Sequence, residues 1–210
     1  MKYIIYNKSC ESMNDLKDES VSCIFTSPPY ALAKDYELKE AIGMSDKPNA
    51  YEEYLARMTT VFKECFRVLQ PGRHIGVNIS FVIQSDKHGR EKKPIPFHFY
   101  TLLKKCGFIF EEQIIWRKAT GMLSQKRFGS FIQNPYPTYY HPGNIYEPIL
   151  VMSKPGDFKM TDKQKEQNKL NWQSFKPFAD DVWYIPADSQ TEHPAPFPLG
   201  LPKVLFQLFS

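Results

Sequence analysis

Apolar residues recur at helical spacing between residues 51 and 69 of the chain. The recurring residues step by three and four positions and are Leu55, Met58, Phe62, Cys65, Phe66 and Leu69. Because this spacing puts their side chains on one face, it predicts an amphipathic helix over Tyr51–Leu69. The sequence Gln70-Pro71-Gly72 then ends the helix, since proline and glycine do not continue it.

Short hydrophobic runs predict the strands of the fold. These runs are Tyr3–Asn7, Val21–Thr26, His74–Ile79, Phe108–Trp116 and Ile145–Ser153. Two further helices are predicted, over Pro96–Cys106 with Gly107 as its stop, and over Leu201–Phe209. The alternation of strands and helices favours an α/β fold with a largely parallel sheet.

Three segments lack a clear hydrophobic period. Residues 84–94 (QSDKHGREKKP) are predicted to form a charged loop, and residues 157–172 (DFKMTDKQKEQNKLNW) a mobile polar insertion. Residues 117–144 are rich in Lys, Arg, Gly, Pro and Tyr. Such segments connect or extend a packed core and do not build it.

Composition limits the class of protein. The chain has 210 residues, of which 42% are hydrophobic, so it suits one domain or one domain with an insertion. Apolar runs stay well below the roughly 20 residues that a membrane span needs, and the first residues are too polar for a secretory signal. We therefore expect a cytoplasmic protein. The net charge of +4 permits a polyanionic partner without requiring one.

The spacing of potential ligands predicts no metal site. The five histidines form no H-x-x-x-H pair and no cluster with cysteine. The four cysteines, Cys10, Cys23, Cys65 and Cys106, include no C-x-x-C pair and are predicted to be free thiols.

The sequence Thr26-Ser27-Pro28-Pro29-Tyr30 directly follows a predicted strand. Ligand sites of open α/β sheets lie at the carboxyl ends of strands. Two prolines fix two φ angles and remove two N–H donors, so the local carbonyls are held as acceptors. With the Ser27 hydroxyl and the flat Tyr30 ring, this loop suits a planar exocyclic amine, such as N4 of cytosine or N6 of adenine. Taken alone, the same residues also fit an ordinary turn.

Two acceptors on such an amine would assist its methylation. The lone pair of the amine is delocalised into the ring, and two hydrogen bonds favour a pyramidal nitrogen as charge develops. The methyl donor then has to lie in line with the nitrogen. This chemistry requires neither a metal nor a covalent intermediate.

The chain resembles the bacterial and archaeal amino-methyltransferases of DNA, which methylate cytosine N4 or adenine N6 with S-adenosylmethionine. Ser27-Pro28-Pro29-Tyr30 resembles their (Asp/Asn/Ser)-Pro-Pro-(Tyr/Phe/Trp) motif. Further similar segments are Tyr54–Gly72 (R-V-L-x-P-G), His74–Ser80, Ile114–Lys118 (I-I-W-x-K), Arg127–Phe131 (R-x-G-S-F), Glu147–Val151 (E-x-I-L-V), Asp181–Trp183 (D-V-W) and His193–Pro198 (H-P-A-x-F-P).

The order of these motifs is similar to the permuted, beta-type arrangement, with the catalytic motif first. The resemblance implies a Rossmann-like S-adenosylmethionine-dependent methyltransferase fold. It divides the chain into a catalytic part (1–118), a target-recognition region (119–191) that contains the returning strand 145–153, and the start of a cofactor-binding part (192–210).

The family's Gly-rich cofactor loop, D-P-F-x-G-S-G, has no counterpart here, because the chain contains no G-x-G. We therefore expect an incomplete fold, from a shortened chain, a disrupted gene or one subunit of a split enzyme. Without the missing strands, Val21–Thr26 would expose a hydrophobic edge. The expected partners are double-stranded DNA and either a complementing polypeptide or a second copy.

The resemblance also assigns roles to residues. The catalytic residues would be Ser27, Pro28, Pro29 and Tyr30. The cofactor would contact Thr26, Ser27, His193, Pro194, Phe197 and Pro198. DNA would contact Lys118, Lys126, Arg127 and Tyr139, although these four also fit a solvated loop. His193 also fits a structural role, and Phe197 a place in the core.

Within the family, serine at the first motif position favours cytosine N4 over adenine N6. The sequence thus predicts a site-specific DNA methyltransferase of a restriction-modification type that flips its target base. Two alternatives stay open: a catalytically silent DNA-binding remnant, and a methyltransferase that acts on RNA or amide amines.

Overall fold

The computed structural model describes residues 3–30, 42, 49–86, 89–118, 136–137, 145–186 and 197–210, with the side chains of 83–90 left out. In chain order its elements are β1 (Val21–Thr26), α1 (Ala50–Val68), β2 (Leu69–Asn78), β3 (Val82–Asp86), β4 (Gly89–Lys93), α2 (Ile95–Lys105), β5 (Ile109–Arg117), β6 (Tyr146–Ser153), α4 (Asp162–Gln167), α5 (Trp172–Phe175), the 3-10 helix η3 (Lys176–Phe178), β7 (Val182–Tyr184) and α6 (Gly200–Phe209).

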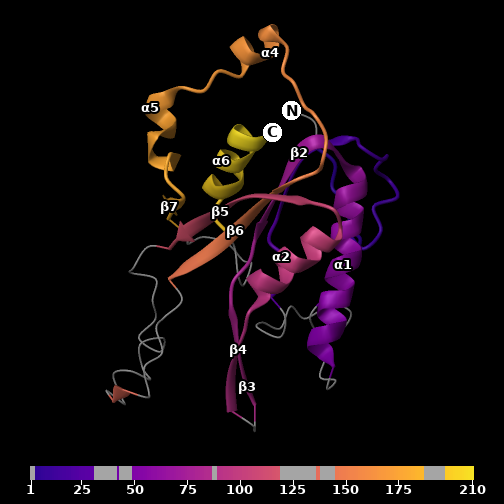
Figure 1. The fold of residues 1–210 in the computed structure, drawn as a ribbon, viewed down its shortest axis with the longest axis vertical. Helices are drawn as coiled ribbons and strands as arrows, with labels where there is room; N and C mark the ends of the chain where they lie inside the picture. The colour runs from indigo at the N-terminus through magenta and orange to yellow at the C-terminus, as the bar shows by residue number, and fades with distance from the viewer. Residues whose placement is uncertain are drawn as a thin grey trace.

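Five strands of the described part form one sheet in the order β1-β2-β6-β5-β7 (Figure 1). β1 pairs with β2 and β5 with β7 in parallel, whereas β6 is antiparallel to both β2 and β5. The α/β class is confirmed. The expectation of a largely parallel sheet was wrong. β6 lies between β2 and β5 and runs antiparallel to both, so the sheet is mixed.

Helices cover both faces of the sheet. α1 and α2 lie together on one face, and α6 lies on the other (Figure 1). The uninterrupted apolar run of β6 explains how both faces are filled, since its residues alternate between the two cores. Leu150 and Met152 belong to the core under α1 and α2, and Ile149 and Val151 to the core under α6.

The predicted helices are confirmed to within one residue at each end. α1 buries the face that its spacing marks, through Tyr54, Met58, Phe62 and Cys65 among others. It ends where Leu69 turns extended, and Gly72 follows with a positive φ of 71°. In the described ranges, no helix is both long and apolar enough to cross a bilayer.

Three polar or terminal segments differ from expectation. Tyr3–Asn7 forms no strand, and Tyr3, Ile4 and Ile5 are 75–84% exposed, because no described strand pairs with them. Part of the predicted charged loop is a hairpin, since β3 and β4 pair antiparallel apart from the main sheet. The polar insertion contains α4, whose first turn is capped by Thr161 and Gln164.

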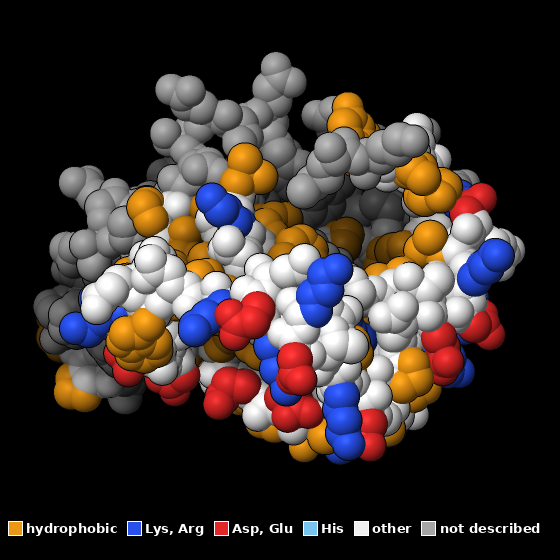
Figure 2. Space-filling view, turned by 90° about the horizontal axis from the view of Figure 1, so that it is seen from above, with side chains coloured by type: hydrophobic (Ala, Val, Ile, Leu, Met, Phe, Trp, Pro, Cys, Tyr) orange, Lys and Arg blue, Asp and Glu red, His pale blue; other side chains and the backbone are white. Residues whose placement is uncertain are grey.

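β1 lies at one edge of the sheet, and no described strand pairs with its outer side. α4 lies at the upper end of the molecule in Figure 1. The view from above shows hydrophobic side chains exposed at the surface of this end, with basic and acidic side chains around them (Figure 2).

Candidate active site

The Ser27–Tyr30 loop lies at the carboxyl end of β1. The last residue of the strand, Thr26, is paired with Val77 of the parallel strand β2, so the two strands end side by side. Pro28 is buried, whereas Ser27, Pro29 and Tyr30 are only partly buried. The loop therefore reaches the surface at the edge of the sheet where α/β folds bind ligands.

A tyrosine of α1 holds the proline elbow from one side. The Tyr54 hydroxyl donates to the carbonyl oxygen of Pro29 at 2.9 Å. Tyr54 is 1% exposed and stacks on Phe99 of α2, with 5.9 Å between ring centroids. Because the hydroxyl is fixed by packing, it fixes the carbonyl that it contacts.

A carboxylate of β6 holds the loop from the other side. The Tyr30 hydroxyl donates to Glu147 Oε2 at 2.7 Å, and Asn78 Nδ2 donates to the same oxygen at 2.7 Å. Asn78 Nδ2 also lies 3.4 Å from Ser27 Oγ. Two residues of the loop are thus linked to the ends of β2 and β6 through one buried polar cluster.

Strand alternation explains why these side chains meet. A Cβ on Gly76 would contact Phe25 and Leu205, so this position faces α6, and Asn78 two residues later faces the same way. Glu147 follows the same rule relative to Ile149 and Val151, which pack under α6. The polar cluster therefore continues the face covered by α6 beyond the end of the hydrophobic core.

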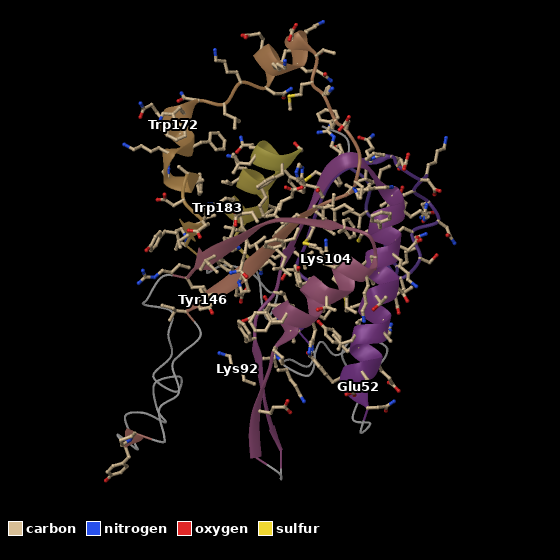
Figure 3. All side chains as sticks on the ribbon, viewed as in Figure 1. Glu52, Lys92, Lys104, Tyr146, Trp172 and Trp183 are labelled. Carbon is tan, nitrogen blue, oxygen red and sulfur yellow. The ribbon has the colours of Figure 1, made fainter. Side chains whose placement is uncertain are left out.

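Lys118 also joins this cluster. Its ammonium lies 2.5 Å from Glu147 Oε1 and 5.1 Å from the centre of the Trp116 ring. Its backbone N–H donates to Ile145 at 2.8 Å, next to the start of β6. Figure 3 shows Tyr146 at this point, on the same lower side of the molecule as Lys92 of the β3–β4 hairpin.

Of the predicted cofactor contacts outside the loop, Phe197 packs against β1. The Phe197 ring meets Phe25 of β1 edge-on, with centroids 5.2 Å apart, and Pro198 is buried. Phe25 directly precedes Thr26, so Phe197 lies near the carboxyl end of β1. His193 and Pro194, and the predicted DNA contacts Lys126, Arg127 and Tyr139, lie outside the described residues.

Glu147 and Asn78 were not among the predicted site residues. A signal for Glu147 is present, because it is the one charged residue in the run Tyr146–Ser153 and is only 5% exposed. Charged residues are seldom buried without a partner. Asn78 is likewise a polar residue in a buried run, at the end of β2, and is 1% exposed.

Two thiols and one phenol near β1 and α1 stay neutral around pH 7. Burial raises the pKa of the Cys23 thiol to about 11 and that of the Cys65 thiol to about 12. Burial, together with the nearby Glu91 and Glu52, raises the pKa of Tyr51 to about 12. These thiols are therefore poor nucleophiles, because the thiolate is the reactive form.

One acceptor in the cluster lacks a partner. Asn78 Oδ1 is buried, and no hydrogen bond reaches it from the part of the chain that the structure describes. Its orientation is set by Nδ2, which must face the Glu147 carboxylate. Buried polar atoms are nearly always satisfied, so an unpaired acceptor in this cluster fits a site that receives a donor-bearing ligand.

The chain is similar to known methylases along most of its length. The model of the DNA methylase family (N6_N4_Mtase) matches residues 21–210. The Type II beta methyltransferase M.BslI of Bacillus sp. (strain NEB-606) is 30% identical over 99% of this chain and 22% of its own length. The Type II methyltransferase M.MthZI of Methanothermobacter thermautotrophicus is 28% identical over 85% of this chain and 53% of its own length.

A solved structure shares the fold along almost the whole chain. The putative DNA modification methylase TTHA0409 of Thermus thermophilus, crystallised with S-adenosyl-L-methionine, superimposes with a TM-score of 0.73 and 26% identity, over 96% of this chain and 71% of its own. The chain thus spans about half or less of these two curated relatives and most of this structural one.

Proposed function

The chain belongs to the DNA methylase family whose members methylate exocyclic amino groups, and we propose that it methylates N4 of cytosine in double-stranded DNA. The observation that carries the proposal is the Ser27–Tyr30 loop, held between Tyr54 and Glu147 at the carboxyl edge of the sheet. A loop fixed on both sides can present acceptors in one geometry, which is what transition-state stabilisation requires.

The target amine is buried in a stacked duplex, so the base has to be flipped out before it reacts. Tyr30 stacks on the flipped base. Ser27 Oγ and the Pro28 carbonyl accept the two amine hydrogens and favour a pyramidal nitrogen. The Pro29 carbonyl is bonded to Tyr54 and only shapes the loop. The nitrogen gains the methyl group as the sulfur–methyl bond of the donor breaks, and the nitrogen gives up one proton to solvent.

S-adenosyl-L-methionine supplies an electrophilic methyl group when bound. The residues that would hold it are Thr26, Ser27, His193, Pro194, Phe197 and Pro198. The contact of Phe197 with Phe25 supports this set, because it brings an aromatic ring close to the catalytic loop. The unpaired Oδ1 of Asn78, whose Nδ2 lies 3.4 Å from Ser27 Oγ, supports a ligand at the same edge.

Recognition of DNA is assigned to the region 119–191, between the catalytic part (1–118) and the start of the cofactor part (192–210). Lys126 and Arg127 would neutralise phosphates, and Tyr139 would stack on a base. Lys118 is a fourth proposed contact, although its ammonium is shared with Glu147. The open edge of β1 supports a further partner, either a complementing polypeptide or a second copy.

Adenine N6 is the alternative target, because both bases present a planar amine to the same two acceptors. Cytosine is favoured by Ser27, since serine at this position accompanies N4 methylation in the family that the motif resembles. A catalytically silent DNA-binding remnant is the other alternative.

Nucleoside mass spectrometry of DNA from cells that express the protein distinguishes these three. We expect 4-methylcytosine; 6-methyladenine would move the target to adenine, and unmodified DNA would support the silent remnant. Ser27→Ala should lower methylation by about 100-fold or more, the usual effect of one lost transition-state donor or acceptor.

Ser22→Ala is the matched control, because Ser22 lies on the same strand and is exposed. Tyr30→Ala should also abolish methylation while duplex binding is mostly kept, because the flipped base loses the ring that holds it beside Ser27. Full activity in either catalytic variant would contradict the assignment.

A further inference from the structure

We propose that Glu147 is a positioning residue, which sets the orientation of the Tyr30 ring and thereby the stacking of the flipped base. This inference rests on the proposed function. It concerns a residue that makes no contact with the reacting atoms and acts through the hydroxyl of Tyr30.

The carboxylate receives hydrogen bonds from three directions. Oε2 accepts from the Tyr30 hydroxyl and from Asn78 Nδ2, each at 2.7 Å, and Oε1 accepts from the Lys118 ammonium. Glu147 is 5% exposed and Asn78 is 1% exposed. Both oxygens are therefore committed in a place with little water, where hydrogen bonds are directional and strong.

The sheet explains why a β6 residue reaches the catalytic loop at all. Pairing between β2 and β6 ends with Asn78 opposite Ile149, whereas β5 and β6 continue to pair through Trp116 opposite Glu147. Glu147 therefore lies just beyond the end of β2. Tyr30 lies four residues after the end of β1, and its hydroxyl reaches the Glu147 carboxylate from there.

The charge of Glu147 has a specific purpose in this geometry. All three neighbours are donors, and only a carboxylate offers two acceptor oxygens. Glutamine offers one oxygen and an NH₂ group, so the substitution would turn a donor toward either Lys118 or the Tyr30–Asn78 side. The Lys118 ammonium balances the charge of the Glu147 carboxylate. The carboxylate can therefore lie in a buried place without an ion or water from solvent beside it.

A merely structural role would affect stability and leave the chemistry unchanged. A positioning role affects the chemical step, because a displaced stacking ring misplaces the amine relative to Ser27 and the methyl donor. Misplacement by about 1 Å can cost roughly 100-fold in rate. The test therefore needs a kinetic readout and a direct readout of the ring.

The experiment compares Glu147→Gln with the wild type in the natural protein. We expect kcat to fall by about 10- to 100-fold while KM for DNA changes by about twofold or less. With 3-fluorotyrosine at position 30, the ¹⁹F resonance of Glu147→Gln should shift or broaden relative to the wild type, in the absence of DNA. Glu64→Gln is the matched control, since Glu64 forms an ion pair with Arg67 on α1 and should leave kcat and the resonance unchanged.

Tyr30→Phe keeps the ring and removes the hydroxyl, so it should reproduce the loss in kcat, and Glu147→Gln should add no further loss in that background. If Glu147→Gln does not fold, the kcat of Tyr30→Phe tests whether the hydroxyl that Glu147 holds is needed. Unchanged kcat, an unchanged ¹⁹F resonance, or losses that multiply in the double variant would overturn the inference. A wild type that methylates no DNA refutes the proposed function instead, and the resonance still reports whether Glu147 fixes Tyr30.

Discussion

At the scale of single residues, two elements hold the Ser27–Tyr30 loop through one side chain each. Tyr54 of α1 bonds the Pro29 carbonyl, and Glu147 of β6 bonds the Tyr30 hydroxyl. The bonds fix different parts of the loop, its backbone and its aromatic ring. A preorganised loop stabilises a transition state without first having to reorganise.

Glu64 shows how one carboxylate can tie the N-terminal segment to α1. It accepts from Arg67 and, at 2.7 Å, from the backbone N–H of Met13. The hydrogen bond from Arg67 lowers the pKa of Glu64 from its ordinary 4.5 to about 2, with a smaller contribution from Met13. Because the folded pKa is the lower one, these bonds stabilise the fold above the unfolded pKa and are lost as pH falls through the folded one.

We therefore predict that the wild type loses more stability than Glu64→Gln between about pH 4.5 and pH 2. Urea unfolding at a series of pH values measures the difference in unfolding free energy. Above this window the wild type should be the more stable protein, and the two should converge as the solution becomes more acidic. Parallel pH profiles would show that Glu64 is not responsible.

At the scale of elements, two glycines allow the end of β6 to lie against the start of β2. Gly72 and Gly156 both have positive φ, at 71° and 137°. A Cβ on Gly72 would lie 2.6 Å from the backbone nitrogen of Phe158, and one on Gly156 would meet Pro71. The Gly72 N–H donates to Lys154 at 2.9 Å, which joins the two segments.

Gly72→Ala should therefore destabilise the protein by about 1–3 kcal/mol, because the new methyl group meets backbone and the residue has an unfavourable φ. Denaturant unfolding of this variant beside Gln70→Ala, which lies two residues earlier in the same strand, measures the effect. A Gly72→Ala protein as stable as the control would mean that the two segments separate without cost.

The same scale shows what the sequence can and cannot predict. α1 was predicted closely because its apolar residues follow one clear period, and β1 because it is a short hydrophobic run that ends just before two prolines. The direction of β6 was not, because an apolar run that is buried on both faces carries no information about pairing. The α4 helix had a signal that was overlooked, since Thr161 and Gln164 have the spacing of a capping box.

The candidate site likewise has a part that the sequence predicts and a part that it does not. The Ser27–Tyr30 motif is contiguous, so the sequence alone was enough to select it. Asn78, Lys118 and Glu147 come from three strand ends, and only the sheet order places them together. Their common face follows from strand alternation, but the order of strands depends on tertiary packing that no local pattern specifies.

At the scale of the whole molecule, β1 is an edge strand whose outer side pairs with no strand of the described residues. β1 pairs only with β2, although its sequence Val-Ser-Cys-Ile-Phe-Thr is strongly apolar. Tyr3, Ile4 and Ile5 are exposed as well. Unpaired edge strands and exposed apolar segments favour association with further strands.

We predict that the isolated polypeptide of residues 1–210 self-associates through β1. Sedimentation velocity over a range of concentrations should show dimers or larger species at micromolar concentration. Ser22→Lys should weaken this association, because Ser22 is an exposed β1 residue and a charge on an edge strand opposes pairing. Lys17→Gln, which changes one charge outside the strand, should have little effect. A polypeptide that stays monomeric up to roughly 100 μM and unfolds cooperatively would show that the edge is protected.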